Sequence, residues 1–165
     1  MYKILFSFLL LCFSTCSFAQ SDAFDFWIGD WELTWQGTNN EIQKGENKIE
    51  SILNKKVIQE NFTSLEGDES SRFKGKSWTV YNPNTDKWKQ TWVDNSGAYL
   101  DFEGFFEDDL KGFKRSFTDK NGTVRYQRMI FYEIKEASFV WDWQSSPDAK
   151  NWTLVWRINY QRKSK

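Results

Sequence analysis

The alternation of aromatic and polar residues limits what this chain can fold into more than any other feature. From Trp31 onward the two kinds of side chain follow one another at period two, which is the pattern of a β-strand with one buried face. The last such segment is the clearest, and its apolar face carries Trp152, Leu154, Trp156, Ile158 and Tyr160. No amphipathic helix longer than a few turns can be drawn. The chain is therefore predicted to be all-β.

About ten such strands follow one another through short turns, including the hairpin signal Asn121-Gly122. An antiparallel meander of this kind either leaves two edge strands exposed or closes on itself. We therefore predict a closed up-and-down antiparallel β-barrel of about ten strands. The segment from Ser21 to Ile28 begins with cap-forming residues and continues with apolar ones, which predicts a short helix with Asp22 near its N-cap. This helix is expected to plug one end of the barrel.

Residues 1–19 have the features of a secretory signal peptide. A positive charge at Lys3 precedes an apolar run over residues 4–13, and the segment ends in Ser17-Phe18-Ala19, with a small residue on each side of Phe18. The run is too short to cross a bilayer, and no later stretch approaches the roughly 20 apolar residues that a spanning helix needs. We predict cleavage after this leader, a single barrel domain over residues 20–165, and export to the periplasm or the medium.

The residue types that are missing exclude several chemistries. Histidine is absent, and both cysteines, Cys12 and Cys16, lie in the predicted leader. The exported chain is therefore expected to have no Ser-His-Asp triad, no cysteine nucleophile and no His- or Cys-ligated metal or haem, and we predict no cofactor. Cys16 could instead carry a lipid, but Thr15 stands where that pattern expects Gly or Ala. A formal net charge of −1 gives no field that would attract nucleic acid or anionic membranes.

The hairpin over residues 78–94 contains the strongest candidate for a binding site. In its second arm Trp88, Gln90, Trp92 and Asp94 fall on one face. A face that only had to fill a core would more simply use Val, Leu and Ile, so large rings mixed with an amide and a carboxylate indicate a lined cavity. Two simpler interpretations stay open: the tryptophans fill the barrel, and Asp94 caps the turn that follows it.

Later strands add three more candidates. Trp143 and Trp156 alternate with polar residues and could stack on a planar or apolar ligand. Arg128, between Tyr126 and Ile130, is interpreted as a buried guanidinium that needs an acidic partner or a ligand carboxylate. The complete predicted set of ligand-binding residues is Trp88, Gln90, Trp92, Asp94, Arg128, Trp143 and Trp156.

Two segments resemble a known family. Residues 24–35 (Phe-Asp-Phe-Trp-Ile-Gly-Asp-Trp-Glu-Leu-Thr-Trp) resemble the start of the DUF1579-type lipocalin-like proteins, which are often exported from bacteria. Residues 88–97, followed by residues 100–104, are similar to the second recurring segment of that family. The resemblance covers nearly the whole predicted exported chain and implies a calycin-like barrel, but no established activity. Within it, Gly29-Asp30-Trp31 resembles the Gly-x-Trp of lipocalins, whose indole closes the barrel floor against a basic side chain. Arg157 or Arg162 is expected to play that part.

Three functions fit these patterns. The first is a monomeric or weakly dimeric protein that binds a small apolar or aromatic molecule inside the barrel. The second is an enzyme that uses carboxylates, for example Asp101 and Glu103 with Glu60 or Arg128, as general acid and base. The third is a protein-interaction module with a filled barrel and an exposed aromatic patch. Inward placement of a pair of carboxylates would favour the enzyme, and a hollow aromatic interior would favour the binding protein.

Overall fold

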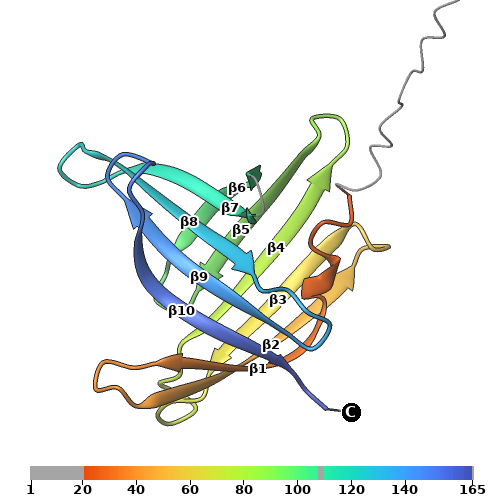
Figure 1. The fold of residues 1–165 in the computed structure, drawn as a ribbon, viewed down its shortest axis with the longest axis vertical. Coiled ribbons are helices and arrows are strands. Elements are labelled where there is room, and N and C mark those ends of the chain that lie inside the picture. Colours follow the sequence, from red (N-terminus) through yellow and green to blue (C-terminus); the bar gives the residue numbers. More distant parts are fainter. Residues whose placement is uncertain (1–20, 108–109, 165) are drawn as a thin grey trace, which may run out of the picture.

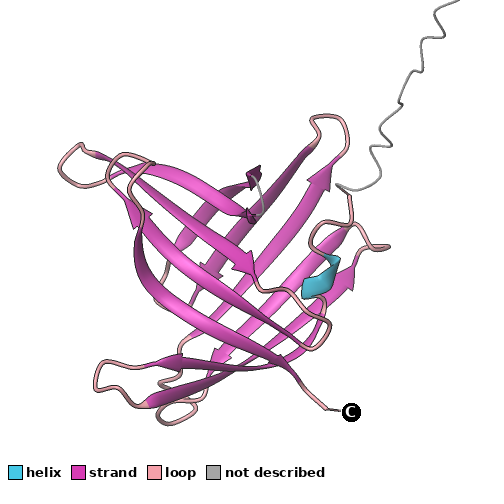
Figure 2. Cartoon of the chain, viewed as in Figure 1, coloured by secondary structure: helices cyan, strands magenta, loops and turns pink. Residues whose placement is uncertain are grey.

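The computed structural model describes residues 21–107 and 110–164, which form a closed barrel of ten antiparallel strands with one short 3-10 helix at one end (Figure 1, Figure 2). The strands pair in the order β1-β10-β9-β8-β7-β6-β5-β4-β3-β2, so each pairs with its sequence neighbours and β1 pairs with β10. The fold predicted from the alternating pattern is confirmed. The predicted leader lies outside the described residues.

The strand boundaries follow the alternating segments closely. The strands are β1 (Gly29–Gln36), β2 (Ile42–Ile52), β3 (Val57–Ser64), β4 (Lys74–Asn82), β5 (Lys87–Asp94), β6 (Tyr99–Glu107), β7 (Leu110–Thr118), β8 (Val124–Tyr132), β9 (Ser138–Ser146) and β10 (Thr153–Arg162). In the described part of the chain no helix has the length and apolar character that crossing a bilayer requires.

The helix is shorter than the sequence suggested. It is the single 3-10 turn η2 (Asp25–Trp27), and the residue at its N-cap position is Phe24 rather than Asp22. The backbone carbonyl of Asp22 accepts from the amide of Asp25 at 3.1 Å, so Asp22 lies in the preceding turn. The Phe24 ring is fully buried.

The barrel is closed where β1 meets β10, and an arginine seals that junction. Trp31 pairs with Arg162 in the β1–β10 ladder, and the Arg162 guanidinium lies 4.1 Å from the centroid of the Trp31 ring. The same guanidinium donates to the carbonyl oxygens of Ile28 at 3.0 Å and Phe26 at 3.3 Å. Of the two arginines considered for this position, Arg162 therefore occupies it. It attaches the helix to the barrel floor by charge-assisted hydrogen bonds.

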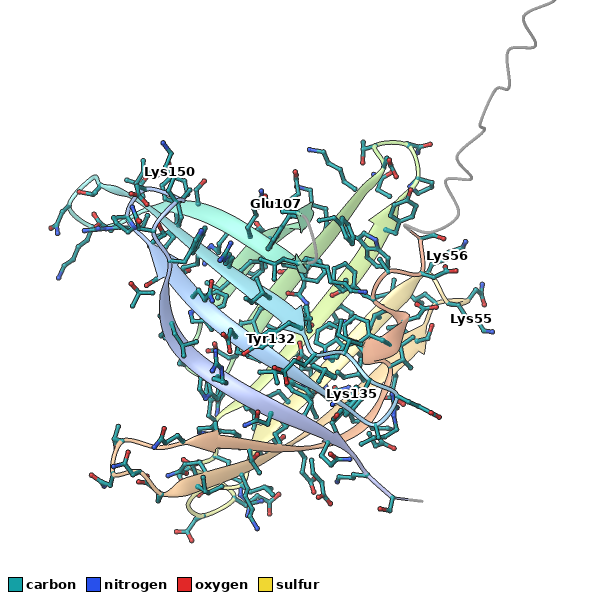
Figure 3. All side chains as sticks on the ribbon, in the orientation of Figure 1. Lys55, Lys56, Glu107, Tyr132, Lys135 and Lys150 are labelled. Atoms are coloured by element: carbon teal, nitrogen blue, oxygen red, sulfur yellow. The ribbon has the colours of Figure 1, made fainter. Side chains whose placement is uncertain are left out.

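Aromatic rings fill the end of the barrel that the helix covers. Phe24 stacks on Phe113 with ring centroids 4.5 Å apart and meets Phe131 edge-on at 5.8 Å. All three side chains are fully buried. Figure 3 shows Lys55 and Lys56 of the β2–β3 turn on this side of the molecule, and Lys150 of the β9–β10 turn on the opposite side. The barrel thus has a filled end, which the helix covers, and an opposite end that has no such plug among the described residues.

Candidate ligand-binding site

A cavity of about 290 Å³ occupies the barrel interior beyond the filled end. Trp27 of the helix forms part of its base, while Trp92, Asp94 and Leu100 border it beside the β5–β6 turn. The cavity therefore extends from the plug toward the hairpin turns of the opposite end. Its volume approaches the range of small-molecule sites in proteins.

Indole rings make up much of the cavity wall. Trp141 and Trp143 on β9 lie nearly parallel, with centroids 6.3 Å apart and an interplanar angle of 12°, and Trp156 on β10 meets Trp141 edge-on at 5.8 Å. Across the barrel, Trp92 contacts Phe62 at 6.2 Å. The four indoles are only partly buried, so part of each ring surface is free to contact a ligand. The wall favours planar or apolar molecules.

A buried carboxyl group lies among these rings. Glu60 on β3 accepts hydrogen bonds from the Asn47 amide at 2.6 Å and the Ser77 hydroxyl at 2.6 Å. Burial raises the pKa of Glu60 to about 7, even though both hydrogen bonds act in the opposite direction. The Asn47 amide also donates to the Tyr160 hydroxyl at 3.2 Å, which links the carboxyl to β10. This network provides the cavity with an ionisable acceptor.

Gln90 supplies a second acceptor to the same interior. Its amide nitrogen donates to the Thr79 hydroxyl at 2.9 Å and lies 3.4 Å from the Ser77 hydroxyl. Its carbonyl oxygen is buried and has no hydrogen-bond partner among the described residues. A buried carbonyl without a donor costs free energy, and a ligand that donates a hydrogen bond would remove that cost.

Asp94 lies at the cavity rim and has two structural tasks. One carboxylate oxygen accepts from the Trp92 indole at 2.9 Å, and the other accepts from the backbone amides of Ser96 at 2.9 Å and Ala98 at 3.2 Å. Partial burial opposes ionisation of Asp94, but the bonds from Ser96, Trp92 and Ala98 outweigh it and lower its pKa. Asp94 therefore caps the β5–β6 turn and fixes the orientation of Trp92.

The structure brings five of the seven predicted residues to one place, because Gln90, Trp92, Asp94, Trp143 and Trp156 all line the cavity. Trp88 does not, although it shares their strand face. Its ring packs 5.1 Å from Phe24 in the filled end and is 4 % exposed. The interpretation of Trp88 as barrel filling is the correct one.

The sequence pattern also predicted the wrong environment for Arg128. Its side chain lies on the outer face of the barrel, where its guanidinium donates to Gln144 at 2.7 Å and covers the Trp152 ring at 4.2 Å from the centroid. The partner is thus an amide and an indole, and not the expected carboxylate. The inward face of β8 instead presents Gln127 and Met129 to the cavity.

The carboxylates proposed for catalysis are not assembled. Asp101 is exposed, and Glu103 points outward between Lys87 and Lys89, which each donate to it at 2.8 Å. These two hydrogen bonds lower the pKa of Glu103 to about 2. The acidic residues that do line the cavity are Glu60 and Asp94, and both oxygens of Asp94 are already engaged.

Several lining residues were not in the predicted ligand-binding set, namely Trp27, Glu60, Phe62, Trp141 and Tyr160. Glu60 was considered only as a partner of Asp101 and Glu103 in the enzyme alternative. Glu60 shares a strand face with the apolar residues Ile58 and Phe62, and these neighbours were the sequence signal that it points inward. In the described residues no group of three or more His, Cys, Asp or Glu side chains is placed to hold a metal ion.

The fold and the site together define a closed ten-stranded β-barrel protein with an aromatic internal cavity and a buried acceptor network. A search of protein-family models finds no match to this chain, and no curated protein matches it.

Proposed function

We propose that this protein is an exported binding protein, monomeric or weakly dimeric, that holds a small apolar or aromatic molecule in its barrel cavity. The observation that carries the proposal is the hollow interior itself, with indoles on its wall and hydrogen-bonding groups at defined points. The proposed export rests on the leader-like residues 1–19, and membership of the DUF1579-type family rests on the two similar segments.

The two alternatives have less support. A protein-interaction module would be expected to have a filled barrel, and the cavity argues against it. An enzyme based on paired carboxylates would be favoured by inward placement of Asp94, Asp101 or Glu103. Asp101 and Glu103 lie on the outer face. Asp94 does line the cavity with Glu60, but both of its carboxylate oxygens already accept hydrogen bonds from the Trp92 indole and the β5–β6 turn. Binding without chemistry is the function that the geometry supports best.

Titration with N-phenyl-1-naphthylamine, a neutral apolar probe, tests the proposal. Saturable quenching of tryptophan fluorescence is expected, because the probe would enter among the indoles. Leu100→Trp places a bulky ring in the cavity wall and should weaken binding at least about tenfold by displacing apolar contact. Val124→Trp makes a comparable change at an exposed position and should have no effect. Unsaturable binding, or equal binding by both variants, would contradict the proposal.

A further inference from the structure

The charges that face the cavity are all of one sign. Glu60 and Asp94 line it, and none of the described residues that line it is Lys or Arg. Arg115 on β7 lies 5.8 Å from the centroid of the Phe102 ring, but it is not part of the lining. A cavity with this balance repels carboxylates and attracts cations.

Glu60 is buried without a counter-ion from the protein. It is 6 % exposed, and no ion pair joins it to any Lys or Arg in the described ranges. Its neighbours from the facing strands are the amide of Asn47, the hydroxyl of Ser77 and, through Asn47, the phenol of Tyr160. An ionised carboxyl in such surroundings is costly unless a cation accompanies it.

Around Glu60 and Gln90 the unused hydrogen-bonding capacity consists of acceptors, while the buried Trp27 indole N–H at the cavity base is a donor without a partner among the described residues. A carboxylate offers about four acceptor positions, and two hydrogen bonds to Glu60 are formed. The Gln90 carbonyl oxygen is buried and unpartnered. The amide groups of Asn47 and Gln90 and the hydroxyl of Ser77 already donate within the network. The part of a ligand that contacts Glu60 and Gln90 must therefore bring donors.

The indole wall suits the same kind of ligand. Trp92, Trp141, Trp143 and Trp156 border the cavity, and indole faces attract cations more strongly than any other protein ring. A carboxylate combined with several indoles recognises an ammonium group more strongly than a neutral group of equal size.

Building on the binding function proposed above, we propose that the natural ligand is an organic ammonium ion with an apolar or aromatic body, and that Glu60 is its counter-ion. The body of the ligand lies among the indoles, and its N–H groups donate to Glu60 and Gln90. Binding at neutral pH then displaces the proton that Glu60 holds in the empty site, and this proton passes to the buffer.

Calorimetric titration with three molecules of similar size tests this assignment: 2-phenylethylamine, 2-phenylethanol and phenylacetate. At pH 8.5 the amine should bind at least about tenfold more tightly than the alcohol, and phenylacetate should bind most weakly. At pH 5.5, where Glu60 is protonated, the preference for the amine should fall to about threefold or less. At pH 7 the heat of amine binding should differ between phosphate and Tris buffers, because a proton is released.

Glu60→Gln should reduce the amine preference at pH 8.5 to about threefold or less and abolish the proton release, since its amide cannot ionise. Glu103→Gln makes the same change on the outer face and should leave both unchanged. A preference that survives Glu60→Gln would overturn the assignment of Glu60. Equal binding of amine and alcohol by the unchanged protein would overturn the ammonium class but leave the binding function standing. Absence of saturable binding by these molecules and by the naphthylamine probe would reject both.

Discussion

Both ends of the barrel are lined by aromatic side chains, yet one interior is filled and the other is hollow. At the helix end, Phe24, Phe113 and Phe131 are fully buried and in mutual contact. At the other end, Trp92, Trp143 and their neighbours surround a cavity. The difference arises because the N-terminal segment adds its own rings to one end and nothing comparable to the other. Aromatic alternation thus identifies an inward face, but a distant segment decides whether that face encloses space.

Glu60 marks the boundary between the two interiors. Ile58, Glu60 and Phe62 face inward in succession along β3, with Ile58 in the buried core and Phe62 on the cavity wall. The polar network around Glu60 therefore lies where packing gives way to open space. This position explains how a carboxyl can be buried and still border the cavity.

The largest expected effect tests the contrast between the ends directly. Phe131→Ala should lower the free energy of unfolding by about 3–5 kcal/mol, because it leaves a sealed void among packed rings. Trp143→Ala removes a larger ring but only widens an existing cavity, and it should cost less than about 2 kcal/mol. Urea denaturation of both variants measures the difference. Equal losses would mean that the two ends do not differ in packing.

A second experiment tests the protonation of Glu60 at the boundary between the two interiors. The pKa of Glu60 is raised from its ordinary 4.5 to about 7, so between these values the folded protein holds a proton that the unfolded chain has lost. Stability should therefore fall as pH rises through this window, by about 3 kcal/mol in all, and level off above it. The absence of histidine makes the window unusually clear.

Glu60→Gln provides the reference, since it cannot titrate. The difference in unfolding free energy between the unchanged protein and this variant, measured by urea denaturation from pH 4.5 to 8, should follow the predicted fall. Curves that stay parallel over the whole range would show that the folded and unfolded states share one pKa for Glu60.

The smallest effect concerns the cavity rim. Asp94→Ala removes the acceptor of the Trp92 indole and of two turn amides, and should cost about 1–2 kcal/mol. Asp101→Ala, at an exposed position near the start of β6, should change stability by less than about 0.5 kcal/mol. A larger loss at Asp101 than at Asp94 would contradict the structural task assigned to Asp94.

The sequence predicts the fold well because both of its determinants are local. Each strand follows from alternation over eight or more residues, and the short turns leave an antiparallel meander with few alternatives. The same local pattern placed Gln90, Trp92 and Asp94 on one face of β5. The pattern put Trp88 on this face too, but it could not show that Trp88 lies in packed core and not at the cavity. That difference depends on the contact with Phe24 from the N-terminal segment.

Alternation cannot identify the inward face of a strand whose two faces carry similar side chains. On β8 both faces contain apolar residues and an arginine, so the pattern gave no reason to prefer Met129 and Phe131 over Arg128 and Ile130. On β2 the isoleucines do not share one face, because Ile49 is buried beside Asn47 while Ile42 is 66 % exposed. Polar residues that point inward to build a network are read from sequence as solvent-facing.

The β1–β10 junction has a consequence for how the chain folds. Trp31 and Arg162 are partners in this ladder although nearly the whole described chain separates them, so joining them closes a very long loop and is expected to come late in folding. Until then two strand edges and many indoles remain accessible to other chains. The period before ring closure is therefore when this protein is most prone to self-association.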